Sequence, residues 1–129
     1  MKYVTPEEIL VIHAVIIEET GGLHGVRDAG LLISAAKRPR AMLGKRELYR
    51  GALTKTAVYI DSLAKHHVFI DGNKRTALAV AARLLFLHGL EYRATNKELE
   101  RFVVRVVTER LDVKTIAYWL QRHTRKARH

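Results

Sequence analysis

The chain has 129 residues, a formal net charge of +10 and no cysteine. Hydrophobic residues make up 48% of it and charged residues 28%, which excludes a disordered or disulfide-bonded protein and predicts a single globular domain over residues 1–129. The longest apolar stretch, residues 76–87, is too short to span a bilayer and is interrupted by Arg83, so we expect a cytoplasmic protein that does not bind membranes.

The first predicted helix begins at a capping box over residues 5–8, where a Pro occupies the first helical position. Two glycines, beginning at Gly21, are expected to end this helix. Helical spacing predicts an apolar face made of Ile9, Ile12, Val15 and Ile16. His13 is interpreted as an ordinary helix residue.

Asp28 is a suitable N-cap for a short helix over residues 29–37. Residues 38–47 are basic and irregular, which is typical of a mobile flap, although a plain surface connection has the same composition. A longer amphipathic helix is predicted over residues 48–66.

Residues 67–75, His-Val-Phe-Ile-Asp-Gly-Asn-Lys-Arg, form the most informative stretch of the chain. Asn73 is expected to cap the next helix, residues 74–88, because its side-chain oxygen can accept from free amides of the first turn. Lys74 and Arg75 would then lie in that turn, where the helix dipole disfavours cations. A bound phosphate would resolve this conflict, since free amides and both cations would face it. The alternative is that both side chains simply extend into solvent.

The last third of the chain predicts two further helices. Residues 91–94 suit a short extended connection, and a second capping box at residues 95–98 opens a helix. Asp112 is expected to cap the final helix, and the basic tail, residues 122–129, is expected to fray. The whole pattern predicts an all-α fold, a compact bundle of about six helices around a central, most buried helix 74–88, with no substantial sheet.

Residues 67–75 contain groups that suit phosphate chemistry. His67 could take a proton from a hydroxyl near neutral pH, and Asp71 is a hard oxygen ligand for Mg²⁺. Phe69 alternates with the polar residues and is expected to anchor the loop in the core. The expected phosphate-binding residues are Gly72, Asn73, Lys74 and Arg75. The spacing of a P-loop and the partner residues of a histidine zinc site are absent from the sequence.

This nine-residue stretch resembles the signature of the Fic/Doc superfamily, and its Asn-Lys-Arg ending resembles the Doc (death-on-curing) branch. Residues 21–32 and 35–39 also resemble the N-terminal pattern of Doc proteins. Fic enzymes usually carry a Gly where this chain has Lys74 and a second Arg where it has Leu78, and they transfer AMP from ATP to a protein hydroxyl. Doc-type proteins share both departures.

The resemblance implies a Doc-like toxin that binds ATP in a reversed pose and transfers its γ-phosphate to a threonine of translation elongation factor Tu, which stops translation. In that likeness His67 is the base and Asp71 is the Mg²⁺ ligand. The phosphate is held by the loop amides together with Gly72, Asn73, Lys74 and Arg75. The segment over residues 38–47 corresponds to the flap that docks the target, and its docking residues would be Arg38, Gly44, Lys45 and Arg46.

An inhibitory helix of the Fic type requires a Ser or Thr with Glu four residues later, and no such pair occurs in the sequence. The resemblance therefore implies a separate antitoxin of the prevent-host-death type, and an acidic one would match the positive charge of the chain. Two alternatives stay open, transfer of a nucleotide moiety to a protein and a basic nucleic-acid-binding module. We do not expect direct nucleic-acid binding, because the sequence shows no convincing aromatic stacking platform or recognition-helix pair.

Overall fold

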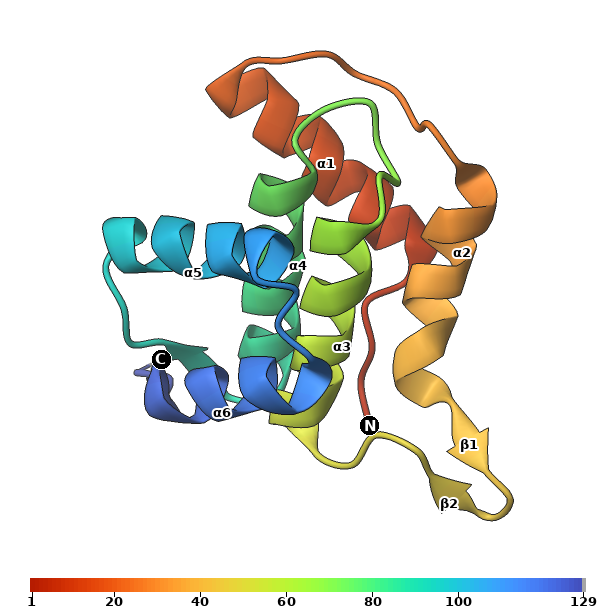
Figure 1. The fold of residues 1–129 in the computed structure, drawn as a ribbon, viewed down its shortest axis with the longest axis vertical. Helices are drawn as coiled ribbons and strands as arrows, with labels where there is room; N and C mark the ends of the chain where they lie inside the picture. The colour runs from red at the N-terminus through yellow and green to blue at the C-terminus, as the bar shows by residue number, and fades with distance from the viewer. Residues whose placement is uncertain (129) are drawn as a thin grey trace.

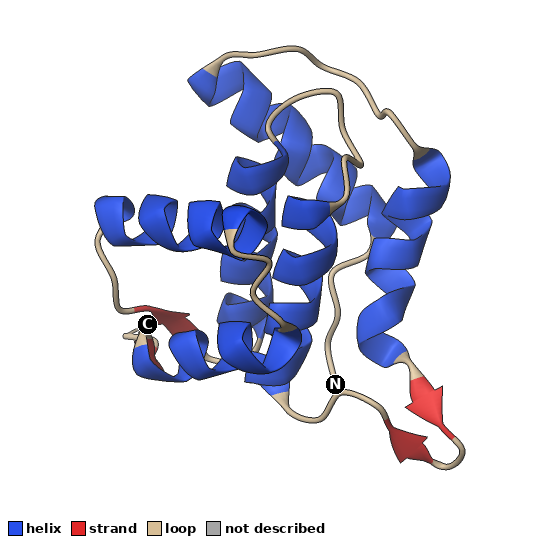
Figure 2. Cartoon of the chain, viewed as in Figure 1, coloured by secondary structure: helices blue, strands red, loops and turns tan. Residues whose placement is uncertain are grey.

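A computed structural model describes residues 1–128 of the chain. This part of the chain forms six α-helices, one short 3₁₀ helix and four short strands (Figures 1 and 2). The helices are α1 (Pro6–Thr20), α2 (Ala29–Lys37), the 3₁₀ helix η1 (Arg38–Arg40), α3 (Ala52–Lys65), α4 (Asn73–Leu87), α5 (Asn96–Thr108) and α6 (Val113–Arg122). The strands are β1 (Met42–Leu43), β2 (Arg46–Glu47), β3 (Leu90–Tyr92) and β4 (Thr124–Lys126). None of the described helices is both long and apolar enough to cross a membrane.

Side chains cap four of the six described α-helices, and they do so where the sequence predicts. Thr5 and Thr95 each form a complete capping box with the glutamate three residues later, at the starts of α1 and α5. Asp28 and Asp112 accept hydrogen bonds from first-turn amides of α2 and α6. The predicted starts of these four helices are therefore confirmed.

The helix predicted over residues 48–66 is shorter at both ends. It begins at Ala52, because Gly51 adopts a φ of 84° that is outside the helical region. It ends at Lys65, so that His66 and His67 lie in the loop that follows.

The core is built around α3. Ten consecutive residues of this helix, residues 55–64, are buried, against six residues in the whole of α4. This burial follows from the position of α3, which packs against α2, α4, α5 and α6. The most buried helix is therefore α3 and not the predicted helix 74–88.

α1 presents a different face to the core from the predicted one. Its buried residues are Ile9, His13 and Ile17, whereas Val15 is 47% exposed. These three residues are spaced four apart and so lie on one helix face. The prediction is wrong for Val15. His13, interpreted as an ordinary helix residue, lies on α1 and is one of its buried residues.

Two small antiparallel sheets were not predicted. β1 and β2 form a hairpin, and β3 pairs with β4. The Nε of Arg125 on β4 lies 2.8 Å from Oε2 of Glu91 on β3. Residues 124–126 are therefore held in a sheet, contrary to the expected fraying of the tail, and His129 lies outside the described residues.

Candidate active site

The sequence signature begins in the loop that joins α3 to α4, residues 66–72, which we call the motif loop (Figure 1). Val68 and Phe69 are buried in the core, whereas His67 and Ile70 are exposed. The buried residues hold the loop on the core, and the histidine stays accessible to a substrate.

A second segment runs along the motif loop and is bonded to its backbone. We call this segment, residues 21–28, the clamp segment; it joins α1 to α2 (orange in Figure 1). Three backbone hydrogen bonds and one antiparallel bridge join the two segments. They are Arg27 N to Val68 O (2.8 Å), Asp28 N to Val68 O (3.1 Å), Ile70 N to Gly25 O (3.1 Å) and the bridge between Val26 and Phe69.

Glycine allows the clamp segment to approach the motif loop this closely. A Cβ at Gly22 would lie 2.5 Å from Oδ2 of Asp71, and a Cβ at Gly25 would lie 2.7 Å from Cδ1 of Ile70. Both glycines also have positive φ, of 118° and 131°, which other residues adopt only with strain. The contact with the motif loop therefore explains the glycines at positions 22 and 25.

Asn73 does not cap α4, contrary to the prediction. Gly72 occupies the N-cap position in a left-handed conformation, with a φ of 76°. Asn73 is the first helical residue, and its Oδ1 accepts from the Phe69 amide while its Nδ2 donates to the Phe69 carbonyl, both at 2.9 Å. Its amide group can replace a backbone partner because it carries one donor and one acceptor side by side. Asn73 thus closes the motif loop.

The N-terminus of α4 consequently has no side-chain cap. Lys74 is exposed, and no partner is recorded for its ammonium group among residues 1–128. Arg75 is bound to the end of α1, where its Nη1 donates to the hydroxyl of Thr20 and to the Gly21 carbonyl at 3.1 Å. Uncapped amides beside a free ammonium group form a suitable binding site for an anion.

The carboxylate of Asp71 is held in place by two backbone amides. Its Oδ2 accepts from the Leu23 amide at 3.2 Å, and its Oδ1 accepts from the Gly72 amide at 2.8 Å. These two hydrogen bonds lower the pKa of the Asp71 carboxyl below its ordinary value, and Arg75, whose Nη2 lies 3.6 Å from Oδ1, adds to the effect. Asp71 is therefore ionised at neutral pH.

The surroundings of Asp71 fit a magnesium ion held by one carboxylate. The side chain is 44% exposed, and each oxygen accepts one amide hydrogen, which leaves a lone pair on each for a metal. Within residues 1–128 no group of three His, Cys, Asp or Glu side chains could enclose a metal. Mg²⁺ does not need such an enclosure, because it commonly binds one carboxylate together with phosphate oxygens and water.

His67 is fixed through its backbone and not through its ring. Its carbonyl oxygen accepts from Nε of Arg27 on the clamp segment at 2.5 Å. In the described part of the chain its imidazole has no recorded partner, and the residue is exposed. The ring is therefore available to a substrate hydroxyl.

His13 contacts this site, although it lies outside the sequence signature. It is 4% exposed, its Nε2 lies 2.9 Å from the carbonyl oxygen of Asp71, and its ring stacks on Phe69 with centroids 3.7 Å apart. The spacing of four residues from Ile9 and from Ile17 was the available signal, since it puts His13 in the middle of the buried face. Arg27 was also missed.

The structure separates the predicted flap residues from the motif loop. Gly44 and Lys45 form the turn of the β1–β2 hairpin, and Arg46 lies on β2; all three are exposed. Arg38 lies in η1, and its Nη1 is 2.5 Å from Oδ2 of Asp61 on α3. Figure 1 shows the hairpin and the motif loop at opposite ends of the long axis of the molecule.

The hairpin is tied to the core by a buried lysine. Lys55 on α3 is fully buried, and its Nζ donates to the carbonyl oxygens of Pro39 and Tyr49 at 3.1 and 2.6 Å. The same atom lies 3.1 Å from Oε1 of Glu47 on β2. Three contacts satisfy the three donors of the ammonium group, which allows the charge to remain buried.

A hollow of about 250 Å³ lies between α2 and α3 and connects the base of the hairpin with the motif loop. Its lining residues are Leu31, Ser34, Ala35, Arg38, Asp61, Ser62 and His66. His66 lines this hollow and also a neighbouring one of about 440 Å³, which is lined by His67 as well.

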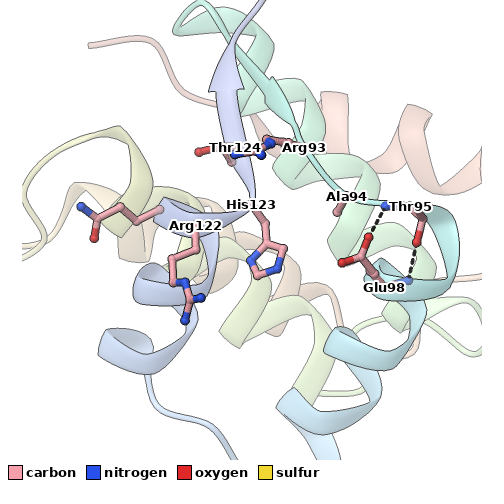
Figure 3. Close-up of a pocket in the computed structure, with 8 residues that line it drawn as sticks. Arg93, Ala94, Thr95, Glu98, Arg122, His123 and Thr124 are labelled. Atoms are coloured by element: carbon pink, nitrogen blue, oxygen red, sulfur yellow. Dashed lines mark hydrogen bonds between the residues drawn. The ribbon is translucent and has the colours of Figure 1, made fainter.

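A larger hollow of about 710 Å³ lies between the start of α5 and the end of α6 (Figure 3). It contains none of the residues of the sequence signature. Its one carboxylate, Glu98, is already bonded to the amide of Thr95 in the capping box. We therefore place the candidate active site at the motif loop and not in this larger hollow.

Known proteins are similar to this chain over most of its length. A family model described as the Fic/DOC family matches residues 3–85, which include the clamp segment and the motif loop. "Toxin Doc" of Mycolicibacterium smegmatis is 34% identical over 118 residues, covering 90% of this chain and 88% of that protein. "Protein kinase doc" of Escherichia phage P1 is 31% identical over 122 residues, covering 95% of each protein.

Proposed function

Because the chain belongs to the Fic/DOC family, we propose that it is the toxin of a toxin–antitoxin system and transfers the γ-phosphoryl group of ATP to a protein hydroxyl. The acceptor in this proposal is a threonine of translation elongation factor Tu, so the transfer inhibits translation in the cytoplasm. Two relatives support the proposal by their names, since one is called a toxin and the other a protein kinase.

One structural observation carries the proposal. The uncapped N-terminus of α4, the free ammonium group of Lys74 and the ionised Asp71 lie on the same short stretch of chain as an exposed histidine. This combination supplies a phosphate site, a ligand for Mg²⁺ and a base, which are the groups that phosphoryl transfer requires.

In the proposed reaction the imidazole of His67 accepts the proton of the target hydroxyl. The hydroxyl oxygen then bonds to the γ-phosphorus, and the bond from that phosphorus to the bridging oxygen breaks, releasing ADP. The free amides of the first turn of α4, with Lys74 and Arg75, would hold the phosphate oxygens. The amide of Gly72 is already bonded to Asp71, and its missing side chain would let the backbone approach the phosphate. Bound Mg²⁺ would offset phosphate charge, and Asp71 would be its protein ligand.

The choice of phosphoryl over AMP transfer rests on two positions. Lys74 adds a cation at the helix start, where Fic enzymes usually have glycine. Leu78 packs against the core, and its carbonyl oxygen accepts from the hydroxyl of Tyr92 at 3.0 Å. No guanidinium group is therefore available at position 78 to hold a second phosphate in the Fic manner.

Docking of the target would use the hairpin and the hollow between α2 and α3. Met42 and Leu43 on the hairpin are exposed, and Gly44, Lys45 and Arg46 follow them. Because the hairpin lies far from the motif loop, a target held there must extend along the hollow to bring its hydroxyl to His67. Arg38, at the base of the hairpin, lines this path.

We further propose an acidic antitoxin of the prevent-host-death type as the partner of the chain. The support is the net charge of +10 and the relative that is named a toxin. An acidic partner would complement this charge over much of the surface.

Transfer can be tested by incubating the protein with ATP, Mg²⁺ and elongation factor Tu, and by measuring the intact mass of the factor. We expect a gain of about 80 Da, whereas AMP transfer would add about 329 Da, values set by the chemistry of the two modifications. His67→Ala should abolish the gain. An AMP adduct on the factor would contradict the proposal, and so would the absence of any adduct when the protein is folded.

The toxin role is tested separately by expressing the chain alone in bacteria. Growth should stop on induction and should continue with His67→Ala expressed to the same level. Normal growth with abundant folded wild-type protein would argue against a toxin.

A further inference from the structure

We propose that His13 is a positioning residue of the transfer reaction, and that it acts by fixing the peptide bond between Asp71 and Gly72. This inference rests on the proposed function and adds a residue of α1 to it. No part of the sequence signature includes His13, which lies 58 positions before Asp71.

The contact of His13 with the motif loop is polar and specific. Its Nε2 lies 2.9 Å from the carbonyl oxygen of Asp71, so a proton on Nε2 makes it the donor to that carbonyl. The amide of the same peptide bond, Gly72 N–H, donates to Oδ1 of Asp71 at 2.8 Å. His13 therefore binds the carbonyl of a peptide group whose amide orients the Asp71 carboxylate.

The ring of His13 also restricts the loop by packing. It stacks on Phe69 with an interplanar angle of 4°, and its Nε2 lies 3.8 Å from the place where Gly72 would carry a Cβ. The ring thus packs against Phe69 and lies close to Gly72. Rotation of the Asp71–Gly72 peptide group would break the hydrogen bond that Nε2 donates to the Asp71 carbonyl.

A purely apolar role does not explain a histidine at this position. Ile9 and Ile17, one turn before and after, fill the same buried face with aliphatic side chains. Burying an imidazole costs free energy unless its nitrogen is hydrogen-bonded. The hydrogen bond of His13 is made to Asp71, whose carboxylate is the proposed metal ligand. The geometry therefore points to placement of Asp71 as the effect of His13.

Substitutions can separate the hydrogen bond from the packing. His13→Gln places an N–H donor at a similar reach and so keeps the bond to Asp71. His13→Phe keeps the stacked ring and loses the donor. We expect His13→Phe to lower kcat at least about tenfold, with KM for the protein substrate changed less than about twofold, and His13→Gln to stay within about threefold of wild type.

Two measurements other than activity complete the test. Hydrogen exchange of the Gly72 and Leu23 amides should accelerate in His13→Phe and not in His13→Gln. Calorimetric titration of Mg²⁺ into protein saturated with ADP should show weaker binding for His13→Phe alone. His88→Phe is the matched control, because His88 donates to a carbonyl in the same way, that of Lys2 at 3.0 Å, away from the motif loop.

Equal kcat and equal Gly72 exchange in His13→Phe and His13→Gln would overturn the inference. If His13→Phe does not fold, His13→Asn replaces it, because its amide is too short to reach Asp71. If the wild type transfers no phosphate at all, the proposed function fails, and the exchange measurement still decides whether His13 fixes the loop.

Discussion

Asparagine is the first helical residue of both α4 and α5, and the two side chains make different contacts. Asn73 bonds to both backbone groups of Phe69, whereas Asn96 is exposed and follows a threonine that already caps its helix. The identity of a residue at a helix start therefore does not define its role. What matters is which backbone groups lie within reach of its side chain.

This contrast leads to a prediction about stability. Asn73→Ala leaves the amide and carbonyl of the buried Phe69 without partners, so the free energy of unfolding should fall by about 2–3 kcal/mol. Asn96→Ala should change it by less than about 0.5 kcal/mol. Urea unfolding of both variants at one pH measures the difference, and equal losses would show that the Asn73 bonds do not hold the loop.

A second prediction concerns pH and Asp71. The Leu23 and Gly72 amides lower the pKa of its carboxyl in the folded state, so this group stabilises the fold fully above its unfolded pKa and loses the effect as pH falls through the lower, folded value. Asn at this position cannot titrate. The stability difference between wild type and Asp71→Asn should therefore be constant at neutral pH and shrink in acid, as followed by urea midpoints over a pH series.

At the level of single residues, the sequence indicates the chemical groups of the site but not the contacts that place them. His67, Asp71 and Lys74 could be singled out because their side-chain chemistry is visible in the signature. His13 could not, because its role depends on a contact with a residue 58 positions away. Asn73 was wrongly predicted as the N-cap of α4, because a side-chain amide can either cap a helix or bond to both backbone groups of another residue.

At the level of elements, the helices were predictable and the strands were not. A capping side chain and its amide lie within three residues of each other, so the starts of α1, α2, α5 and α6 are encoded locally. β3 and β4 are three residues long, and Glu91 meets Arg125 across 34 positions. β3 and β4 therefore depend on a distant partner, which no local pattern reveals, whereas β1 and β2 are short strands that pair locally.

The anchoring of the β1–β2 hairpin is tested by removing its buried lysine. Lys55→Met leaves the carbonyl oxygens of Pro39 and Tyr49 unpaired, and the free energy of unfolding should fall by about 2–4 kcal/mol. Hydrogen exchange of the amides of residues 42–47 should accelerate more than that of α3. Lys45→Met, at the exposed turn, is the control and should leave both quantities unchanged.

At the level of the whole molecule, the charge of +10 predicts how partners associate. If the antitoxin is acidic, its association rate should fall by about tenfold or more between low and high salt, because screening shortens the reach of the attraction. Its dissociation rate should change much less. Stopped-flow mixing over a salt series measures both rates. A salt-independent association rate would mean that the net charge does not guide this partner.

The clamp segment also has a consequence for how the protein is made. Leu23 meets Asp71 across 48 positions, so its amide leaves the ribosome well before the carboxylate it binds exists. Contacts of such separation form only after a large loop has closed. The nascent chain therefore carries a complete signature before it has an assembled site. The clamp segment stays without its partner, the motif loop, until α2 and α3, which lie between the two segments in the sequence, have been synthesised.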